Sequence, residues 1–136
     1  MDFATGVKSA WSRYAQFNGR SCRAEFWYFR LSVSGGNLLI TLVSNLIGVS
    51  GSPIAMFVMA SISLIFALAV IIPDLSVSCR RLHDRDRSGW WVLLILIPII
   101  GWIILLIWVC QPGQRGSNRF GPDPLGPPPN VADLFS

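Results

Sequence analysis

The sequence has 136 residues, of which 52% are hydrophobic and 13% are charged, and its formal net charge is +4. A typical soluble domain has about 25% charged residues, so roughly half of the usual ionic surface is missing. Asp, Glu, Lys and Arg are absent between Arg30 and Asp74 and again between Arg87 and Arg115. These stretches exclude a soluble fold with polar faces there, and the hydrophobic content excludes a disordered chain. The composition predicts one small membrane domain.

The N-terminal segment 3–17 is predicted to form an amphipathic helix. Phe3, Val7, Ala10 and Tyr14 follow helical spacing, and polar residues occupy the rest of the surface. Such a helix lies in the membrane interface or packs against its own protein, and the pattern leaves both possibilities open.

The first charge-free stretch predicts two membrane helices. It holds 43 residues, whereas one crossing of a bilayer core about 30 Å thick needs roughly 20 apolar residues. Small residues and a proline between Gly48 and Pro53 mark a turn. We therefore expect membrane helices over 26–47 and 54–82, the second with a kink at Pro73.

The second charge-free stretch predicts a third membrane segment over 90–110. Its 21 residues would form a helix about 31 Å long, which is one full crossing. Tryptophans at both ends are typical of residues at the two membrane surfaces. Pro98 and Gly101 leave an alternative, a re-entrant hairpin of two half-depth helices. We favour the single crossing, which places the C-terminus opposite the N-terminus.

The fold class predicted by these elements is all-α, a small multi-pass transmembrane helical bundle. It has about three membrane segments and an N-terminal amphipathic interfacial helix. We expect a single membrane domain over 1–125 and an extended or disordered Pro-rich tail over 126–136.

The basic residues predict the orientation of the chain. Five precede the first crossing and four lie between the second and third segments, whereas the 48–53 turn has none. The positive-inside rule then places the N-terminus and the 80–89 loop in the cytoplasm. The two groups are Lys8, Arg13, Arg20, Arg23 and Arg30, followed by Arg80, Arg81, Arg85 and Arg87.

The 80–89 loop has the densest charge in the chain. Its guanidinium groups could bind phosphate bidentately, or they could set topology and attract anionic lipid. The interleaved Asp84 and Asp86 reduce that attraction and favour an ordered loop with fixed ion pairs. Arg80 and Asp84 are one helical turn apart and could form such a pair.

No metal, cofactor or nucleic-acid site is expected. The chain has one histidine, and Cys22, Cys79 and Cys110 have no ligand spacing. The basic residues are few and flank the membrane segments, which argues against nucleic acid. An enzyme acting on membrane lipid, with His83 and Asp84 as acid and base, remains a third hypothesis.

Polar residues within the predicted crossings are a separate group of candidates. Asn37, Thr41 and Asn45 recur at i, i+4 and i+8, a pattern that favours helix packing over a solute path. Asp74 is an intramembrane carboxylate and hence a functional candidate, unless it reaches interfacial water or Arg81.

Three sequence strings resemble the signatures of one family. They are Gly19-Arg20 with Arg23-Ala24-Glu25-Phe26-Trp27, then Arg80-Arg81-Leu82-His83-Asp84 with Ser88-Gly89-Trp90-Trp91, and Cys110-Gln111-Pro112-Gly113 with Gly116-Ser117-Asn118-Arg119-Phe120. The family is the YhaH-like bacterial inner-membrane proteins, domain of unknown function 805. The resemblance implies a multi-pass protein of the inner (plasma) membrane and carries no activity. Arg85-Asp86 departs from the family pattern, in which Thr or Ser is more often followed by Gly or Asp.

The leading hypothesis is a non-enzymatic membrane protein with an Arg-rich cytoplasmic border. This border would bind anionic lipid headgroups or a membrane partner protein, and homo-oligomers are possible. The alternative is a subunit of an oligomeric transporter or channel for ions or small solutes. The candidate border residues are Arg20, Arg23, Glu25, Trp27, Arg80, Arg81, His83, Asp84, Ser88, Trp90, Asn118 and Arg119, and the intramembrane ones are Asn37, Thr41, Asn45 and Asp74.

Overall fold

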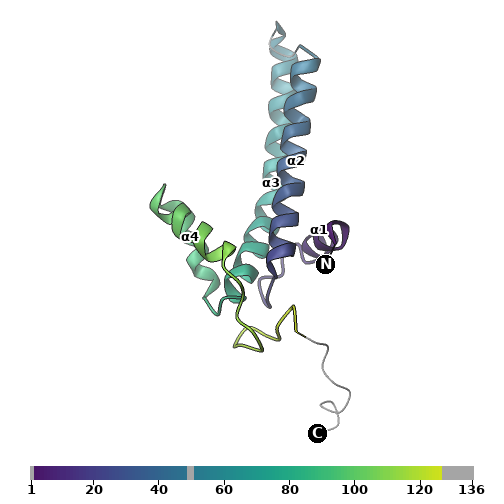
Figure 1. Cartoon of the computed structure of the whole chain (residues 1–136). Coiled ribbons are helices and arrows are strands. Elements are labelled where there is room, and N and C mark those ends of the chain that lie inside the picture. Colours follow the sequence, from purple (N-terminus) through teal and green to yellow (C-terminus); the bar gives the residue numbers. More distant parts are fainter. Residues whose placement is uncertain (1, 49–50, 127–136) are drawn as a thin grey trace. The chain divides into compact units, whose positions relative to one another are not determined.

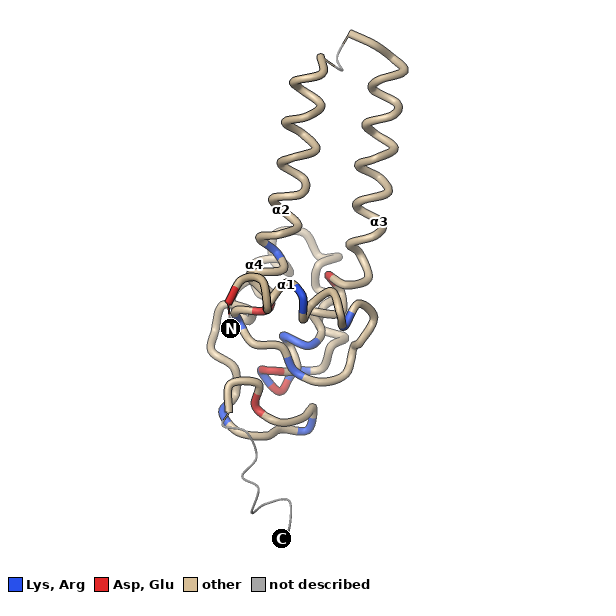
Figure 2. The backbone as a smooth tube through the Cα atoms, turned by 90° about the vertical axis from the view of Figure 1, so that its right-hand side faces the viewer, with Lys and Arg blue, Asp and Glu red and all other residues tan. Residues whose placement is uncertain are grey.

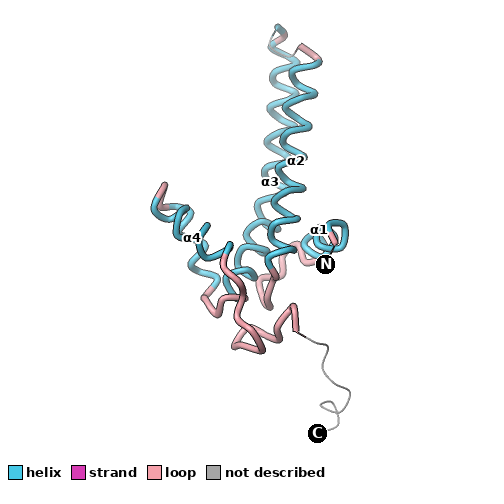
Figure 3. Tube along the Cα trace, in the orientation of Figure 1, coloured by secondary structure: helices cyan, strands magenta, loops and turns pink. Residues whose placement is uncertain are grey.

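A computed structural model describes residues 2–48 and 51–126 of the chain. The elements in chain order are α1 (Phe3–Ser12), α2 (Arg23–Leu46), α3 (Pro53–His83), the 3-10 helix η2 (Gly89–Leu96) and α4 (Ile100–Cys110) (Figure 1). Apart from an isolated bridge between Asn118 and Gly121, these residues form no β-structure (Figure 3). The all-α class is confirmed for them, whereas the tail beyond Gly126 lies outside the described residues.

The contacts divide the chain into two compact units. The first unit comprises residues 1–16 and 24–77, and the second comprises 17–23 and 78–136. Helix α3 contributes its long apolar part to the first unit and its charged end to the second.

In the first unit, α2 and α3 form a helical hairpin (Figures 1 and 2). Gly36 allows close approach, because a Cβ atom there would lie 2.8 Å from the ring of Phe66. The distal part of this hairpin carries no charged residue (Figure 2), and many of its large apolar side chains are exposed. The helices predicted over 26–47 and 54–82 are therefore present, each within about three residues of its expected bounds.

Of the helices within 2–48 and 51–126, α3 is the one long and apolar enough to cross a membrane. Its most apolar 18 residues have a mean hydropathy of 2.7, and only 6% of them are buried inside the protein. Exposed apolar surface of this extent marks a face that contacts lipid or another protein, so α3 is compatible with a membrane. A crossing by α2, whose exposed face includes Asn37 and Asn45, stays a prediction.

Helix α1 is shorter than predicted, because it ends at Ser12 and not at Phe17. It begins where the Asp2 side chain accepts a hydrogen bond from the Thr5 N–H. After Ser12 the backbone turns to bond with α3: the Ser76 hydroxyl donates to the carbonyls of Arg13 and Gln16, at 3.1 and 2.6 Å. These tertiary bonds outweigh the local helical pattern.

Helix α3 continues as one helix through Pro73. Proline has no N–H, so the carbonyl four residues earlier, that of Ala69, loses its helical partner. The Tyr14 hydroxyl donates to this carbonyl at 2.9 Å. Since an unpaired carbonyl costs several kcal/mol in hydrocarbon, this bond explains how an apolar helix accommodates the proline.

The prediction of a single straight helix over 90–110 is wrong. The rings of Trp91 and Trp108 lie 5.7 Å apart, whereas one helix would separate residues 17 positions apart by about 26 Å. The chain reverses at Ile99, which has φ +66° and ψ −69°, and the Ile100 N–H donates to the Pro98 carbonyl at 2.8 Å. These values define a γ-turn with positive φ at its central residue, which is the rarer and more strained of the two γ-turn types. Pro98 prevents the helix from continuing through it.

Glycine makes this reversal possible. A Cβ atom at Gly101 would collide with the carbonyl of Leu94, so only glycine lets α4 cross the backbone of η2 this closely. The Trp102 indole then donates to the Ile95 carbonyl at 2.9 Å. Helices η2 and α4 are therefore the two arms of a tight hairpin.

Candidate functional site, an arginine-rich polar cluster

The second unit is built around the carboxylate of Asp84. One oxygen accepts from Arg20, with Nη2 at 2.8 Å, and the other accepts from Arg81, with Nη1 at 2.5 Å. The three side chains are only 1%, 0% and 4% exposed for Arg20, Arg81 and Asp84. Two guanidinium groups that share one buried carboxylate leave a net positive charge at the centre of this unit.

Further N–H groups of these arginines donate to backbone carbonyls in the last turn of α4 and in the segment after it. Arg20 bonds to the carbonyls of Gln114 and Gly116. Arg81 bonds to those of Val109, at 3.1 and 3.2 Å, and Gln111. The last carbonyls of a helix have no partner within it, so the arginines both cap α4 and hold the segment 109–116.

Arg85 extends the same pattern along this segment. It donates to the Pro112 carbonyl at 2.9 Å and to the side-chain oxygen of Gln111. The Gln114 N–H donates to the Asp84 carbonyl at 2.7 Å. Between these bonds, Gly113 passes so close to the Asp84 carboxylate that a Cβ atom would collide with it. The close approach to Asp84 therefore explains the glycine of the Pro112-Gly113 pair.

His83 joins the first and last of the three signature strings. Its Nδ1–H donates to the Gly19 carbonyl at 2.9 Å, and its ring stacks on Phe120 with centroids 3.9 Å apart and planes 3° from parallel. The side chain of Asn118 donates to the His83 carbonyl at 2.9 Å and accepts from the Phe120 N–H. We call the whole set the arginine cluster: Arg20, Arg81, His83, Asp84, Arg85, Asn118 and Phe120, with the carbonyls of 109–116.

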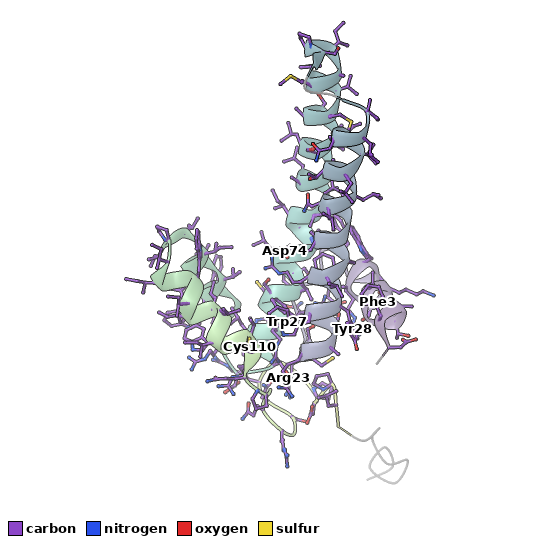
Figure 4. The ribbon with its side chains drawn as sticks, turned by 45° about the horizontal axis from the view of Figure 1, so that its top comes forward. Phe3, Arg23, Trp27, Tyr28, Asp74 and Cys110 are labelled. Atoms are coloured by element: carbon purple, nitrogen blue, oxygen red, sulfur yellow. The ribbon has the colours of Figure 1, made fainter. Side chains whose placement is uncertain are left out.

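A pocket of about 370 Å³ opens beside the arginine cluster. Arg23 and Arg115, both exposed, contribute guanidinium groups, and Asp84 lies in the wall. In Figure 4 Arg23 lies close to Cys110, whose carbonyl is 3.5 Å from its Nη1. The other lining residues are Pro112, Gly113, Gln114, Asp123, Leu125 and Gly126.

Asp123 is the acidic group at the edge of this pocket. The N–H groups of Leu125 and Gly116 donate to its carboxylate, at 2.9 and 3.0 Å. These bonds hold the pKa of the Asp123 carboxyl below its ordinary value of 3.8. The pocket therefore combines two exposed cations with the Asp123 carboxylate, which stays ionised near neutral pH, and with buried Asp84.

The structure brings some of the predicted border residues together and separates others. Arg20, Arg81, His83, Asp84 and Asn118 form the arginine cluster, and Arg23 lines the pocket. Four other border residues lie outside this cluster and pocket. Arg119 pairs with exposed Asp86 at 3.2 Å, and Ser88 caps η2. Trp90 is 80% exposed, whereas Arg80 is fully buried. Glu25 and Trp27 belong to the first unit, where buried Glu25 accepts from the Ser9 hydroxyl and exposed Trp27 packs on Phe26.

The intramembrane candidates do not meet in one site. Asn37, Thr41 and Asn45 are exposed along α2, and the Thr41 hydroxyl donates to the Asn37 carbonyl at 3.0 Å. Asp74 forms an ion pair with Arg30 at 3.3 Å, so its partner is this arginine on α2 and not Arg81, which is held by Asp84.

Sequence reasoning missed Arg115, Gln114 and Asp123 in the pocket and Phe120 in the cluster. Arg115 is the first charge after the second apolar stretch, and a basic residue directly after a membrane segment is a recognisable signal. Among residues 2–48 and 51–126, no three His, Cys, Asp or Glu side chains lie close enough together to hold a metal ion.

The apolar helices and the enclosed arginines define a small helical membrane protein, and the comparisons with known proteins identify its family. The family model "Protein of unknown function (DUF805)" matches residues 14–122, and the chain belongs to this family. It is 42% identical over 114 residues to "Inner membrane protein YhaH" of Escherichia coli (strain K12), covering 82% of this chain and 88% of the relative. It is 38% identical over 116 residues to "Inner membrane protein YhaI" of the same strain, covering 85% and 92%. No solved structure matches the chain.

Proposed function

We propose that this chain is a non-enzymatic inner-membrane protein that binds the phosphate groups of anionic lipids in the pocket beside its arginine cluster. The observation that carries the proposal is the pair of exposed guanidinium groups, Arg23 and Arg115, in one pocket. Guanidinium groups bind phosphate oxygens bidentately. The names of its relatives favour the inner membrane as the location of this chain.

The arginine cluster supports this role by supplying charge and rigidity. Arg20 and Arg81 are committed to Asp84 and to backbone carbonyls, so they position the segment 112–116 and do not themselves meet a ligand. Around the pocket, Arg20, Arg23, Arg81 and Arg115 outnumber Asp84 and Asp123 by two charges, which favours an anion.

The same contacts argue against acid–base catalysis by His83 and Asp84. The His83 ring is fixed between Gly19 and Phe120, and the Asp84 carboxylate accepts from two buried arginines. A general acid or base must reach a proton on its substrate, and both groups here are engaged inside the protein.

The orientation we propose keeps the N-terminus and the 80–89 loop in the cytoplasm. Nine basic residues surround the first two membrane segments on this side, and none lies between Arg30 and Asp74. The pocket then faces the cytoplasmic leaflet, where anionic headgroups attract basic residues by about 1 kcal/mol each.

Binding of phosphatidylglycerol to protein in nanodiscs tests the proposal. We expect the double variant Arg23→Ala with Arg115→Ala to bind about 30-fold more weakly, from roughly 1 kcal/mol per arginine. Arg119→Ala is the matched control, because it removes an exposed charge that pairs with Asp86 outside the pocket. Unchanged binding by the double variant, or an equal loss in Arg119→Ala, would contradict the proposal. Retention of a protein instead of lipid would point to a membrane partner.

The second candidate function is a subunit of an oligomeric transporter or channel. The exposed Asn37, Thr41 and Asn45 of α2 favour it, because polar side chains that face hydrocarbon gain from hydrogen-bond partners on another helix. Native mass spectrometry from nanodiscs checks this candidate. An oligomer that becomes monomeric in Asn37→Leu supports it, whereas a monomeric parent protein contradicts it.

A further inference from the structure

We infer that η2 and α4 form a re-entrant hairpin that enters the acyl chains of one leaflet and returns to the same membrane surface. The segment after Cys110 then lies on the side of the 80–89 loop. This inference rests on the hairpin itself and is independent of the proposed headgroup binding.

The lengths of the two arms fit half of a bilayer. Helix η2 has 8 residues, which span about 16 Å at the 3-10 rise. Helix α4 has 11 residues, which span about 16 Å at the α-helical rise. Half of the hydrocarbon core measures about 15 Å. Each arm therefore reaches the middle of the bilayer and neither can cross it.

The surface of the hairpin is suited to lipid. At the turn, Leu96, Ile99 and Ile100 are 75%, 66% and 66% exposed. No Asp, Glu, Lys or Arg occurs between Arg87 and Arg115. An exposed apolar patch of this kind favours aggregation in water, whereas lipid acyl chains contact it without an unfavourable hydration free energy.

The turn also provides hydrogen-bond partners for several backbone groups that would otherwise face hydrocarbon unpaired. The N–H groups of Ile97, Ile100 and Gly101 donate to the carbonyls of Leu94, Pro98 and Ile97. Pro98 has no N–H to satisfy, and the Trp102 indole donates within the hairpin. Because each unpaired backbone group costs several kcal/mol in hydrocarbon, these bonds lower the cost of placing the turn there.

The base of the hairpin has the composition of a membrane surface. The Arg87 guanidinium lies over the Trp108 ring, 4.1 Å from its centroid, and Trp91 packs edge-on against the same ring. Arg81 of the arginine cluster holds the end of α4, and Ser88 caps the start of η2. Aromatic and basic residues at one level mark an interface, so both ends of the hairpin lie there.

Cysteine cross-linking in native membranes tests the hairpin. With Cys110→Ser as background, we expect Trp91→Cys with Trp108→Cys to be joined by a short bifunctional maleimide. The rings at these positions are 5.7 Å apart, and a linker does not require the strict Cβ geometry of a direct disulfide. The control pair Ile99→Cys with Trp108→Cys, about 13 Å apart along the helix, should stay unlinked. An unlinked first pair would overturn the inference, because a full crossing separates these positions by about 26 Å.

A reporter fused after Ser136 gives a second measurement that changes no residue of the hairpin. We expect a fluorescent protein to be active there and alkaline phosphatase to be inactive, as for the same reporters inserted between Asp84 and Arg87. Reporters on opposite sides of the membrane at the two positions would overturn the inference. Phosphatidylglycerol binding by the pocket is measured in a separate experiment, so the headgroup-binding proposal and the hairpin inference can each fail without the other.

Discussion

The α2–α3 hairpin and the arginine cluster differ in which side chains they bury. The hairpin exposes apolar side chains, whereas the arginine cluster buries charged ones. In the hairpin, Leu39, Phe57 and Ile65 are 63%, 74% and 67% exposed. In the arginine cluster, Arg20, Arg81 and Asp84 are buried. Inside a bilayer the hydrophobic effect does not drive helix association, so removing an exposed apolar side chain has a small effect. Removing one member of a buried ion pair leaves the other charge uncompensated and is strongly destabilising. The two regions should therefore respond to mutation in opposite ways.

The largest effect is expected from Asp84→Ala. It leaves two buried guanidinium groups without their carboxylate, which costs about 3–5 kcal/mol. Hydrogen exchange in nanodiscs should show faster exchange over 80–87 and 109–118, with residues 55–70 unchanged. Asp86→Ala is the control, because its exposed pair with Arg119 contributes about 0–1 kcal/mol. Equal protection in both variants would show that the ion pairs do not hold this region.

A matched pair of leucines sharpens the comparison. Leu82 is 1% exposed and Leu68 is 58% exposed. We expect Leu82→Ala to lower the free energy of unfolding by about 2–5 kcal/mol, as in other packed cores. Leu68→Ala should change it little, because its methyl groups contact lipid in both states. Unfolding in mixed micelles measures both variants, and similar losses would place Leu68 in a protein interface.

The bond between Tyr14 and Ala69 gives a smaller effect within the first unit. Tyr14→Phe removes the donor to the carbonyl freed by Pro73, at a cost of about 1–2 kcal/mol. Pro73→Ala restores the helical donor, so Tyr14→Phe should cost less in that background. A double-mutant cycle measures this coupling. Additive losses would mean that the two positions act independently.

The smallest effect is a pH dependence confined to the second unit. Since its hydrogen bonds lower the pKa of Asp123 below 3.8, the ionised carboxylate stabilises the 116–125 turn at higher pH. This contribution is lost as the pH falls through the lowered pKa. The amide shifts of Gly116 and Leu125 should titrate with a midpoint below 3.8, and Asp123→Asn should abolish the titration. A midpoint above 3.8 would contradict the prediction.

Much of the helical arrangement could be predicted from the sequence, because apolar length and breakers determine it. The two helices and the turn between them follow from the charge-free stretch and from the breakers before Pro53, and both helices extend beyond that stretch into charged residues. Segment 90–110 was ambiguous, since 21 residues fit either one crossing or two half-depth arms. Pro98 and Gly101 marked the reversal, and the close approach of Gly101 to Leu94 shows that the chain turns back there.

The candidate site was predictable in its residues and not in their partners. The order of Arg and Asp in the 80–89 loop indicated fixed ion pairs, and Asp84 does form them. The arginines paired with it are Arg20 and Arg81, however, whereas the sequence indicated Arg80. Arg20 is 64 positions away, and most other acceptors are backbone carbonyls that no residue type identifies. The contribution of Arg115 and Asp123 to one pocket depends on the path of the 110–123 segment, which has no periodic pattern.

The contact between Arg20 and Gly116 constrains the order in which the protein is assembled during synthesis. The two residues are 96 positions apart, so at about 5–20 residues per second Gly116 is made roughly 5–20 s after Arg20. Both long helices are complete before the last acceptor of Arg20 exists. The arginine cluster therefore closes only after the α2–α3 hairpin has been made, as the final step of assembly.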